Sequence, residues 1–259
     1  VATARDGSGA SARCKVRVVR KVTKITLNKY TAKLLVGKTL KLKAKVHPKN
    51  ATIKSVAWSS SDNSIATVDS SGRVQGLAAG MVKIRAKAKD GSGKSAVCLI
   101  TVSEPIPATG VDVTNNELIV AKGRQIQSGI TIAPANSTDK IRYYSDNKAV
   151  ARINKRGKIY ANKVGQATVY GETSNGQVGY ADVLVVTMNR RSLPLRLYDT
   201  ETLRVNEIST GVTWHSQNPL IASVDSTGKV IGRQRGVTRI YATVRGLKLS
   251  CKVTVSDIQ

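Results

Sequence analysis

Short runs of alternating aliphatic and polar residues fill most of the chain. Residues 39–46 and 82–89 each place an aliphatic side chain at every second position, with Thr, Lys, or Arg between them. Successive side chains of a strand point to opposite faces, so this pattern predicts antiparallel sheets with one face on a core and one in water. No window of useful length shows the period of an amphipathic helix. The pattern therefore predicts an all-β chain.

The same pattern returns along the chain, which is the strongest signal in the sequence. The run WSSSDNSIATVDSSGRV begins at Trp58 and returns as WHSQNPLIASVDSTGKV at Trp214, with a weaker copy, YYSDNKAVARINKRGKI, at Tyr143. Each aromatic residue precedes one glycine by 14 residues, and a second glycine follows 8 residues later. These glycines are Gly72 and Gly80, Gly157 and Gly165, and Gly228 and Gly236. The constant spacing indicates tandem copies of one domain.

The repeats divide the chain into four segments. Residues 1–20 match the end of the first full repeat, because RDGSGASARCKVRV from Arg5 resembles KDGSGKSAVCLITV from Lys89. We therefore expect an interior piece of a longer protein, made of the C-terminal part of a preceding domain (1–20), two full domains (21–103 and 104–187), and a shortened domain (188–259). The shortened domain lacks a clear counterpart of the strand at 39–46. Pro-containing linkers are expected at 103–109 and near Pro194.

The repeated motifs resemble the bacterial immunoglobulin-like group 2 family. The resemblance rests on V-G-K-T-L-x-L, P-x-N-A, W-x-S-x-[DN]-x-x-I-A-x-V-D-x-x-G-x-V, a closing G-x-x-x-I strand, and a final C-x-[VI]-x-V strand. It implies tandem immunoglobulin-like β-sandwich domains of about seven strands each. Such domains occur in intimin- and invasin-like adhesins, Gram-positive surface proteins, and phage tail appendages. The resemblance implies no chemistry for the domain itself.

Charge adds one feature that a sandwich does not require. The formal net charge is +26, of which residues 22–103 carry +12 and residues 104–187 only +3. Two basic rows are expected on outward strand positions of the first full repeat: Lys41, Lys43, and Lys45, and then Lys83, Arg85, Lys87, and Lys89. Such rows keep a sheet soluble and protect its edges. They also suit an anionic polymer, because like charges across a sheet otherwise repel. Both interpretations stay open.

Residues that could carry chemistry favour structural roles. Cys14, Cys98, and Cys251 occupy about the same place in the last strand of separate domains, so no intradomain disulfide can form. We predict three reduced and buried thiols. His47 and His215 have no repeated partner, which excludes a zinc site or a catalytic triad. The sequence therefore predicts no catalytic, cofactor-binding, or metal-binding residue.

The repeated aromatic and acidic residues are also expected to be structural. Trp58, Tyr143, and Trp214 follow an inward aliphatic residue by two positions, so their rings should pack on the core. Asp69 and Asp225 precede Ser-Ser-Gly and Ser-Thr-Gly, where a carboxylate accepts hydrogen bonds from backbone amides in a turn. One carboxylate per turn is too few for calcium.

These observations predict a non-enzymatic extracellular array, structural or adhesive, that spaces or displays a binding region at a bacterial surface. Its partners would be the neighbouring domains and an anionic polysaccharide, a teichoic acid, or a host surface. The alternative is a decoration or tail module of a phage or filament particle, which would self-assemble. A nucleic-acid-binding module is disfavoured, because no exposed aromatic residues interleave with the basic rows and no nucleic-acid fold motif occurs.

Overall fold

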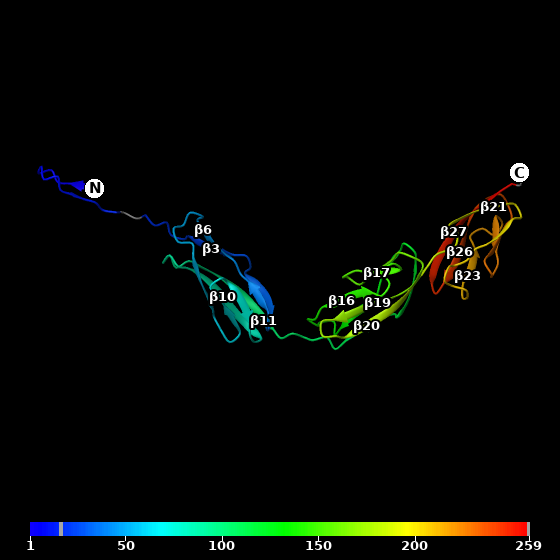
Figure 1. Cartoon of the computed structure of the whole chain (residues 1–259), viewed down its shortest axis with the longest axis horizontal. Helices are drawn as coiled ribbons and strands as arrows, with labels where there is room; N and C mark the ends of the chain where they lie inside the picture. Colours follow the sequence, from blue (N-terminus) through cyan, green and yellow to red (C-terminus); the bar gives the residue numbers. More distant parts are fainter. Residues whose placement is uncertain (16–17, 258–259) are drawn as a thin grey trace. The chain divides into compact units, whose positions relative to one another are not determined.

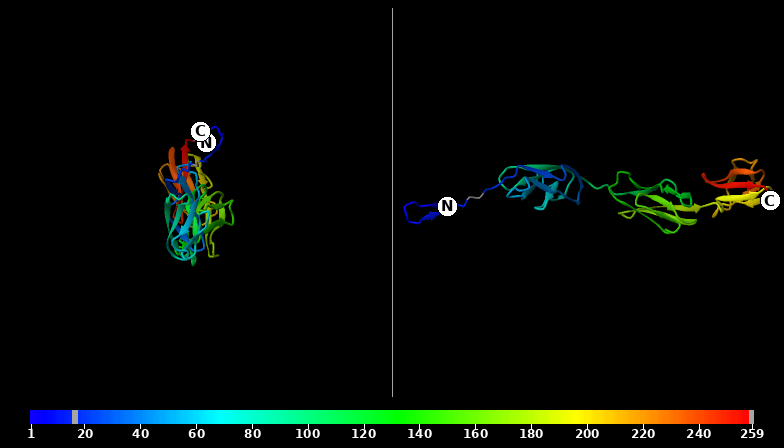
Figure 2. Two further views of the ribbon diagram at one scale, coloured as in Figure 1. Left: turned by 90° about the vertical axis from the view of Figure 1, so that its left-hand side faces the viewer. Right: turned by 90° about the horizontal axis from the view of Figure 1, so that it is seen from above.

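The computed structural model describes residues 1–15 and 18–257, and every regular element in them is a β-strand (Figures 1 and 2). Two residues of the segment 1–20 (16–17) and two of the segment 188–259 (258–259) lie outside the described residues. The chain divides into two compact units, Val1–Pro105 and Ile106–Gln259. Among the described residues no helix is long and apolar enough to cross a membrane. The all-β prediction is confirmed.

The first sandwich contains strands β3 to β11 in two layers around an aliphatic core. One layer is a four-stranded sheet in the order β4 (Thr31–Leu35), β11 (Ser95–Ser103), β10 (Gly80–Ala88), and β7 (Val56–Ser60). The other layer pairs β3 (Lys24–Leu27) with β6 (Ala44–His47) and orders β5 (Thr39–Lys41), β9 (Arg73–Gly76), and β8 (Ala66–Val68). Leu42 and Val74 from this layer meet Ile84 and Ile100 from the first, and all four are buried. Only the β4–β11 pair is parallel.

The predicted strand at 39–46 is interrupted. Its first part, β5, pairs with β9, and its last part, β6, pairs with β3. The break lies at Leu42 and Lys43, where the Lys43 amide donates to the Asn28 side chain (2.7 Å) and the Asn28 amide donates to the Lys43 carbonyl (3.1 Å). The alternation of exposure survives the break: Leu42 is buried while Lys41, Lys43, and Lys45 are exposed. The expectation of one continuous strand was wrong.

The second sandwich repeats this plan with strands β12 to β20. Its four-stranded sheet has the order β13 (Glu117–Ala121), β20 (Val178–Val186), β19 (Gly165–Thr173), and β16 (Ile141–Ser145). The opposite layer contains β12 (Gly110–Val113) with β15 (Ile130–Ala133), and β14 (Gln125–Gln127), β18 (Lys158–Ala161), and β17 (Ala151–Ile153).

The third sandwich is reduced. Its four-stranded sheet has the order β21 (Ser192–Arg196), β27 (Leu247–Ser256), β26 (Gly236–Val244), and β23 (Thr213–Ser216), opposite β22 (Thr200–Thr202), β25 (Lys229–Gly232), and β24 (Ala222–Val224). The β3–β6 pair of the first sandwich is replaced by one bridge between Met188 and Val205. Pro194 lies inside β21 and not in a linker, since an edge strand tolerates a residue without an amide hydrogen.

A turn glycine packs against the aromatic ring of each repeat, which explains their constant spacing. The three pairs are Gly72 with Trp58, Gly157 with Tyr143, and Gly228 with Trp214. Gly72 has a φ of +82°, and a Cβ atom there would lie 2.8 Å from the Trp58 ring and 2.7 Å from the Leu42 carbonyl oxygen. Trp58 is half-buried and packs against the core, as predicted for an inward ring. The constant spacing between aromatic residue and glycine therefore follows from a packing contact that each repeat contains.

Candidate functional site

The candidate site is the outer face of β10 in the first sandwich. Lys83, Arg85, and Lys87 are exposed there, alternating with buried core residues. We call these three residues the β10 row. Their cross-strand neighbours are Leu99, Val97, and Ser95 on β11, and Ser59 and Ala57 on β7. None of these paired neighbours, all of them within the described residues, is a carboxylate.

The β10 row also lacks ion-pair partners. The four ion pairs found among the described residues use Arg142, Arg190, Arg235, and Arg245. None of them involves the β10 row. Lys89 follows β10 directly, is exposed, and donates its backbone amide to the Ser55 carbonyl (3.1 Å). The predicted residues Lys83, Arg85, Lys87, and Lys89 thus form one exposed basic line. No ion pair among the described residues neutralises their charge.

The other predicted basic row lies in the opposite layer. Lys41 belongs to β5 and Lys45 to β6, so the core separates both from the β10 row. Lys41 is also engaged locally, since its Nζ donates to the carbonyl oxygen (2.6 Å) and to Oγ (2.7 Å) of Ser71. One flat ligand cannot contact both rows. The structure therefore brings together residues 83–89 and leaves Lys41, Lys43, and Lys45 apart.

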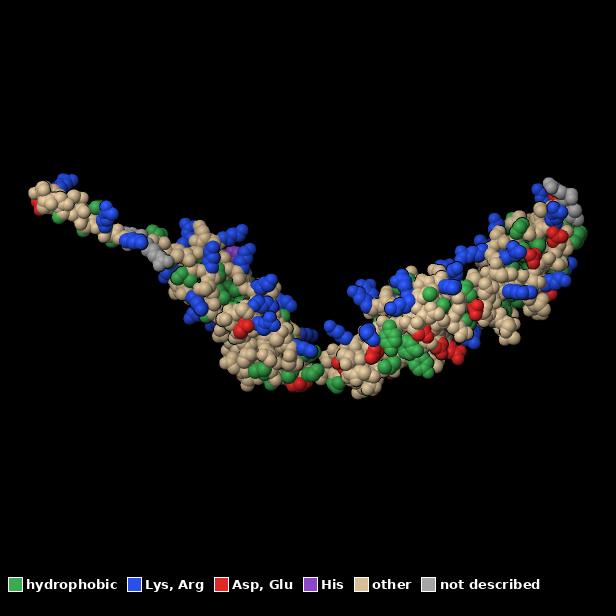
Figure 3. All heavy atoms as spheres, in the orientation of Figure 1, with side chains coloured by type: hydrophobic (Ala, Val, Ile, Leu, Met, Phe, Trp, Pro, Cys, Tyr) green, Lys and Arg blue, Asp and Glu red, His purple; other side chains and the backbone are tan. Residues whose placement is uncertain are grey.

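One cation of this face was missed by the sequence reasoning. Lys33 on β4 is exposed and lies opposite Thr101 of β11, in the row next to Lys83. Its strand is short and pairs in parallel, so alternation alone did not assign it to this sheet. Lysine and arginine side chains lie at many places on the visible surface of the first sandwich (Figure 3).

The same face of the second sandwich carries different residues. Tyr144, Tyr170, and Tyr180 lie directly opposite one another on β16, β19, and β20. We call them the tyrosine row. The rings of Tyr144 and Tyr170 stack with centroids 5.0 Å apart, and Tyr180 follows at 6.2 Å from Tyr170. Figure 3 shows hydrophobic side chains gathered over β19 and β20, next to acidic ones. No signal within one strand could have revealed this row, because it depends on the pairing of three strands.

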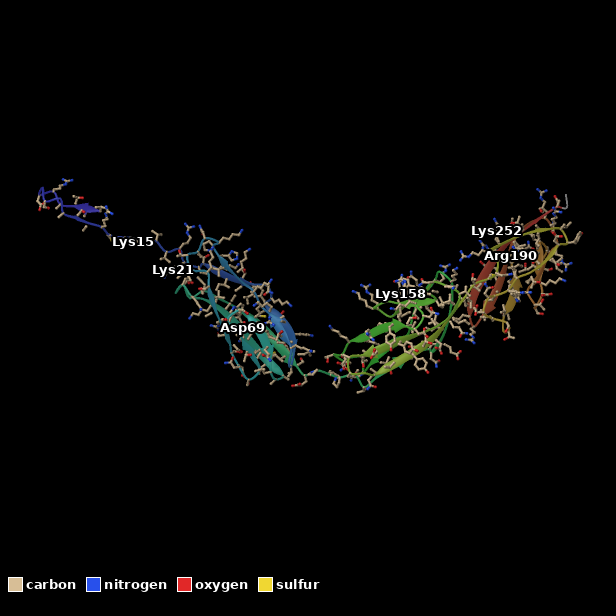
Figure 4. All side chains as sticks on the ribbon, viewed as in Figure 1. Lys15, Lys21, Asp69, Lys158, Arg190 and Lys252 are labelled. Atoms are coloured by element: carbon tan, nitrogen blue, oxygen red, sulfur yellow. The ribbon has the colours of Figure 1, made fainter. Side chains whose placement is uncertain are left out.

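The aspartates of the repeated turn are structural. Asp69 (labelled in Figure 4) accepts hydrogen bonds at Oδ1 from the amides of Ser71 (2.9 Å) and Arg73 (2.8 Å). Hydrogen bonds from Ser71 and from the Arg73 amide lower the pKa of the Asp69 carboxyl. Asn154 accepts the equivalent pair of amide hydrogen bonds in the second sandwich. Since a neutral side chain serves equally, the turn does not require a metal ligand.

The cysteines agree with the prediction at two positions and contradict it at one. Cys98 and Cys251 are fully buried, and burial raises the pKa of both thiols, that of Cys251 to about 11. Cys14 is exposed, because the described residues around it (1–15) form a small hairpin of β1 (Ala2–Thr3) and β2 (Ser11–Ala12). In the part of the chain that the structure describes, no second layer covers Cys14 as one covers Cys98. The prediction of three buried thiols was therefore wrong for Cys14.

The chain resembles known proteins over most of its length. The sequence pattern of the bacterial Ig-like domain (group 2) matches residues 21–98 and 107–181, more than half of the chain. An uncharacterized protein of Clostridium acetobutylicum is 32% identical over 64% of this chain, and an Ig-like virion protein of Serratia phage KSP90 is 30% identical over 65%. The chain spans 17% and 66% of the lengths of these relatives.

A solved structure found to be similar to this chain is invasin, described as a bacterial integrin-binding protein. It shares 11% identity over 92% of this chain and 60% of its own, with a TM-score of 0.38. The chain belongs to the bacterial Ig-like domain (group 2) family, with two matched copies in tandem.

Proposed function

We propose that this chain is a non-enzymatic extracellular array that spaces a bacterial surface structure and holds an acidic cell-surface polymer on the first sandwich. The polymer would be an acidic polysaccharide or a teichoic acid, lying along the β10 row. The family match supports the array, since it places two domains of this group in tandem in the chain. The local charge of the first sandwich supports the ligand.

The observation that carries this proposal is the uncompensated β10 row. Its three cations stand at every second residue, hence about 7 Å apart along the strand. Like charges this close repel one another unless counterions or a ligand neutralise them. A polyanion that follows the strand would neutralise several at once and release its own condensed counterions. Lys89 extends this line, while Lys41, Lys43, and Lys45 would offer a second, weaker surface on the opposite layer.

The proposal is tested by replacing Lys83, Arg85, Lys87, and Lys89 with Gln in the full chain. The replacements keep the face polar, so the fold should persist. Binding to purified teichoic acid should weaken by at least about tenfold in low salt, because each phosphate contact contributes through charge neutralisation. The matched control replaces four exposed cations of the second sandwich with Gln: Lys148, Lys155, Arg156, and Lys158. Equal losses in both variants would show that net charge alone binds the polymer, and would contradict the proposal.

A second candidate is decoration of a phage particle. The match to the phage virion protein supports it, because that match covers 66% of the phage protein. In that role the array would sit on the outside of a particle, and the basic face would contact an acidic cell surface during adsorption. Antibody labelling of purified particles by electron microscopy distinguishes the two, since only the second candidate predicts label on particles.

A further inference from the structure

The tyrosine row is not required by the sandwich. In the first sandwich the same three positions hold Ser59, Arg85, and Val97, and the sheet pairs in the same register. The chain has no Phe and only eight Tyr, yet three of the Tyr meet in this one row. Outward positions of a half-solvated sheet are normally polar. The second sandwich therefore has aromatic rings at outward positions where the fold does not require them.

The rings form an ordered surface. The planes of Tyr144 and Tyr170 differ by 11°, and the Arg142 guanidinium lies 5.2 Å from the Tyr144 ring centroid. Stacking of this kind restricts each ring, so little side-chain freedom remains to be lost on binding. Tyr180 ends the row on the side of β13 and remains 53% exposed. It is the ring most open to a ligand.

A polar pocket of about 400 Å³ borders this row. Asp146, Thr168, and Asp182 line it, each two residues from a tyrosine of the row and hence about 7 Å away. Thr168 lies on β19 and Asp182 on β20, while Asp146 directly follows β16. The Thr168 hydroxyl donates to Asp182 Oδ1 (2.8 Å), and the Thr168 amide donates to Asp146 Oδ1 (2.8 Å). Gln166 adds a side-chain amide to the lining. These hydrogen bonds hold the carboxylates of Asp146 and Asp182 in place through Oδ1, and Oδ2 of each can accept a hydrogen bond from a ligand.

The charge of this pocket is opposite to that of the chain. Glu117, Asp146, and Asp182 line it, although the chain has 16 acidic and 42 basic residues. The one cation in the lining, Arg245, pairs with Glu117 at 3.2 Å. An anionic polymer would be repelled here. A ligand that donates hydrogen bonds and carries an apolar face would satisfy both the carboxylates and the rings.

We propose that this face binds a neutral saccharide. The C–H face of a sugar ring would lie on Tyr180, and its hydroxyl groups would donate to Asp182 and Asp146 and bond with Gln166. Sugars combine a ring face of C–H groups with neighbouring hydroxyls, which is the combination that this surface complements. The site is independent of the proposed polymer-binding face, since it lies on another sandwich and does not depend on net positive charge.

The test uses the full chain and a panel of short neutral oligosaccharides of glucose, N-acetylglucosamine, galactose, and mannose, with binding measured by calorimetry. At least one sugar should bind, with an affinity that is unchanged when salt is raised. Tyr180→Ala should weaken this binding by about tenfold, since it removes the stacked ring face. Asp182→Asn should also weaken it, whereas Tyr180→Trp should retain it.

The matched control is Tyr160→Ala. Tyr160 lies in the opposite layer on β18, where the Arg152 guanidinium sits 3.9 Å from its ring centroid. This variant should bind sugar as the parent does. The proposal is overturned if no neutral sugar of the panel binds, or if Tyr180→Ala and Asp182→Asn both bind as tightly as the parent. Binding of polylysine in place of any sugar would equally overturn it. None of these outcomes bears on teichoic acid binding by the first sandwich.

Discussion

The first and second sandwiches present the same sheet face with opposite chemistry. At three equivalent positions across the sheet, the first has Ser59, Arg85, and Val97, and the second has Tyr144, Tyr170, and Tyr180. One row further along, Lys83 in the first corresponds to Thr168 between two aspartates in the second. Backbone pairing is shared, so the difference lies entirely in outward side chains. The strand pairing shared by the two sandwiches therefore does not determine which side chains this outer face presents.

The inner side of the same sheets shows why this freedom exists. Ile84 and Cys98 of the first sandwich correspond to Val169 and Ala181 of the second, and all four are buried. Burial of these aliphatic groups supplies the stability, whereas exposed residues contribute little to it. Outer residues can therefore diverge without loss of the fold.

The largest effect should come from breaking the shared framework. Trp58→Ala removes a ring that packs against Gly72 and the core, and should lower the stability of the first sandwich by about 3 kcal/mol. The second sandwich should melt unchanged, since its own ring is Tyr143. Calorimetric melting of the full chain measures both. Trp58→Phe is the control and should cost less; an unchanged melting profile for Trp58→Ala would refute this packing role.

A smaller effect is expected when the outer faces are exchanged. Tyr144→Ser, Tyr170→Arg, and Tyr180→Val together give the second sandwich the residues of the first. Loss of the stacked rings should cost about 1–2 kcal/mol, without unfolding, because cross-strand pairs contribute modestly. Chemical denaturation measures the change. Complete unfolding of this variant would show that the tyrosines belong to the framework.

A still smaller effect is expected at the shared inner position. Cys98→Val replaces a buried thiol with a hydrophobic side chain of similar size, so the stability of the first sandwich should change by less than about 1 kcal/mol. In the parent, Cys14 should react rapidly with a thiol reagent, while Cys98 and Cys251 react only after unfolding, because both are buried and their thiol pKa is raised. Rapid native labelling of Cys98 would contradict the sandwich register.

The smallest effect is a difference in acid sensitivity. The pKa of Asp69 is lowered in the folded state from 3.8, so its turn contributes stability above that pH and loses it as pH falls through the lowered value. The second sandwich has Asn154 at this turn and lacks the contribution. Asp69→Asn should therefore make the acid melting of the first sandwich less steep. Identical acid profiles for parent and variant would show that the charge contributes nothing.

The sequence predicted the framework well because its signals are local. Period-two alternation and the spacing from Trp58 to Gly72 follow from strand geometry and from one packing contact, so both can be recognised within a single repeat. The interruption at Lys43 was missed because alternation reports which face a side chain occupies and not which strand pairs with it. Cys14 was misplaced because its alignment with Cys98 carries no information on whether a second layer covers it.

The two faces differ in how much the sequence could reveal. Lys83, Arg85, and Lys87 lie on one strand, so the sequence shows the β10 row as basic residues at every second position. The tyrosine row joins residues from three strands, and only the register of β16, β19, and β20 brings Tyr144, Tyr170, and Tyr180 together. Register depends on turns and long-range pairing, which one sequence does not specify.

The central claim is that the equivalent sheet faces of the first and second sandwiches bind different ligands independently of each other. It is tested most directly by the salt dependence of teichoic acid binding in three full-length proteins. These are the parent, Tyr180→Ala, and the variant with Gln in place of Lys83, Arg85, Lys87, and Lys89 (the Gln variant). We predict that the affinity of the parent and of Tyr180→Ala falls steeply and equally as salt rises, and that the Gln variant shows weak binding with a shallow slope. A Gln variant with the slope of the parent, or a Tyr180→Ala variant that loses polymer binding, would contradict the account.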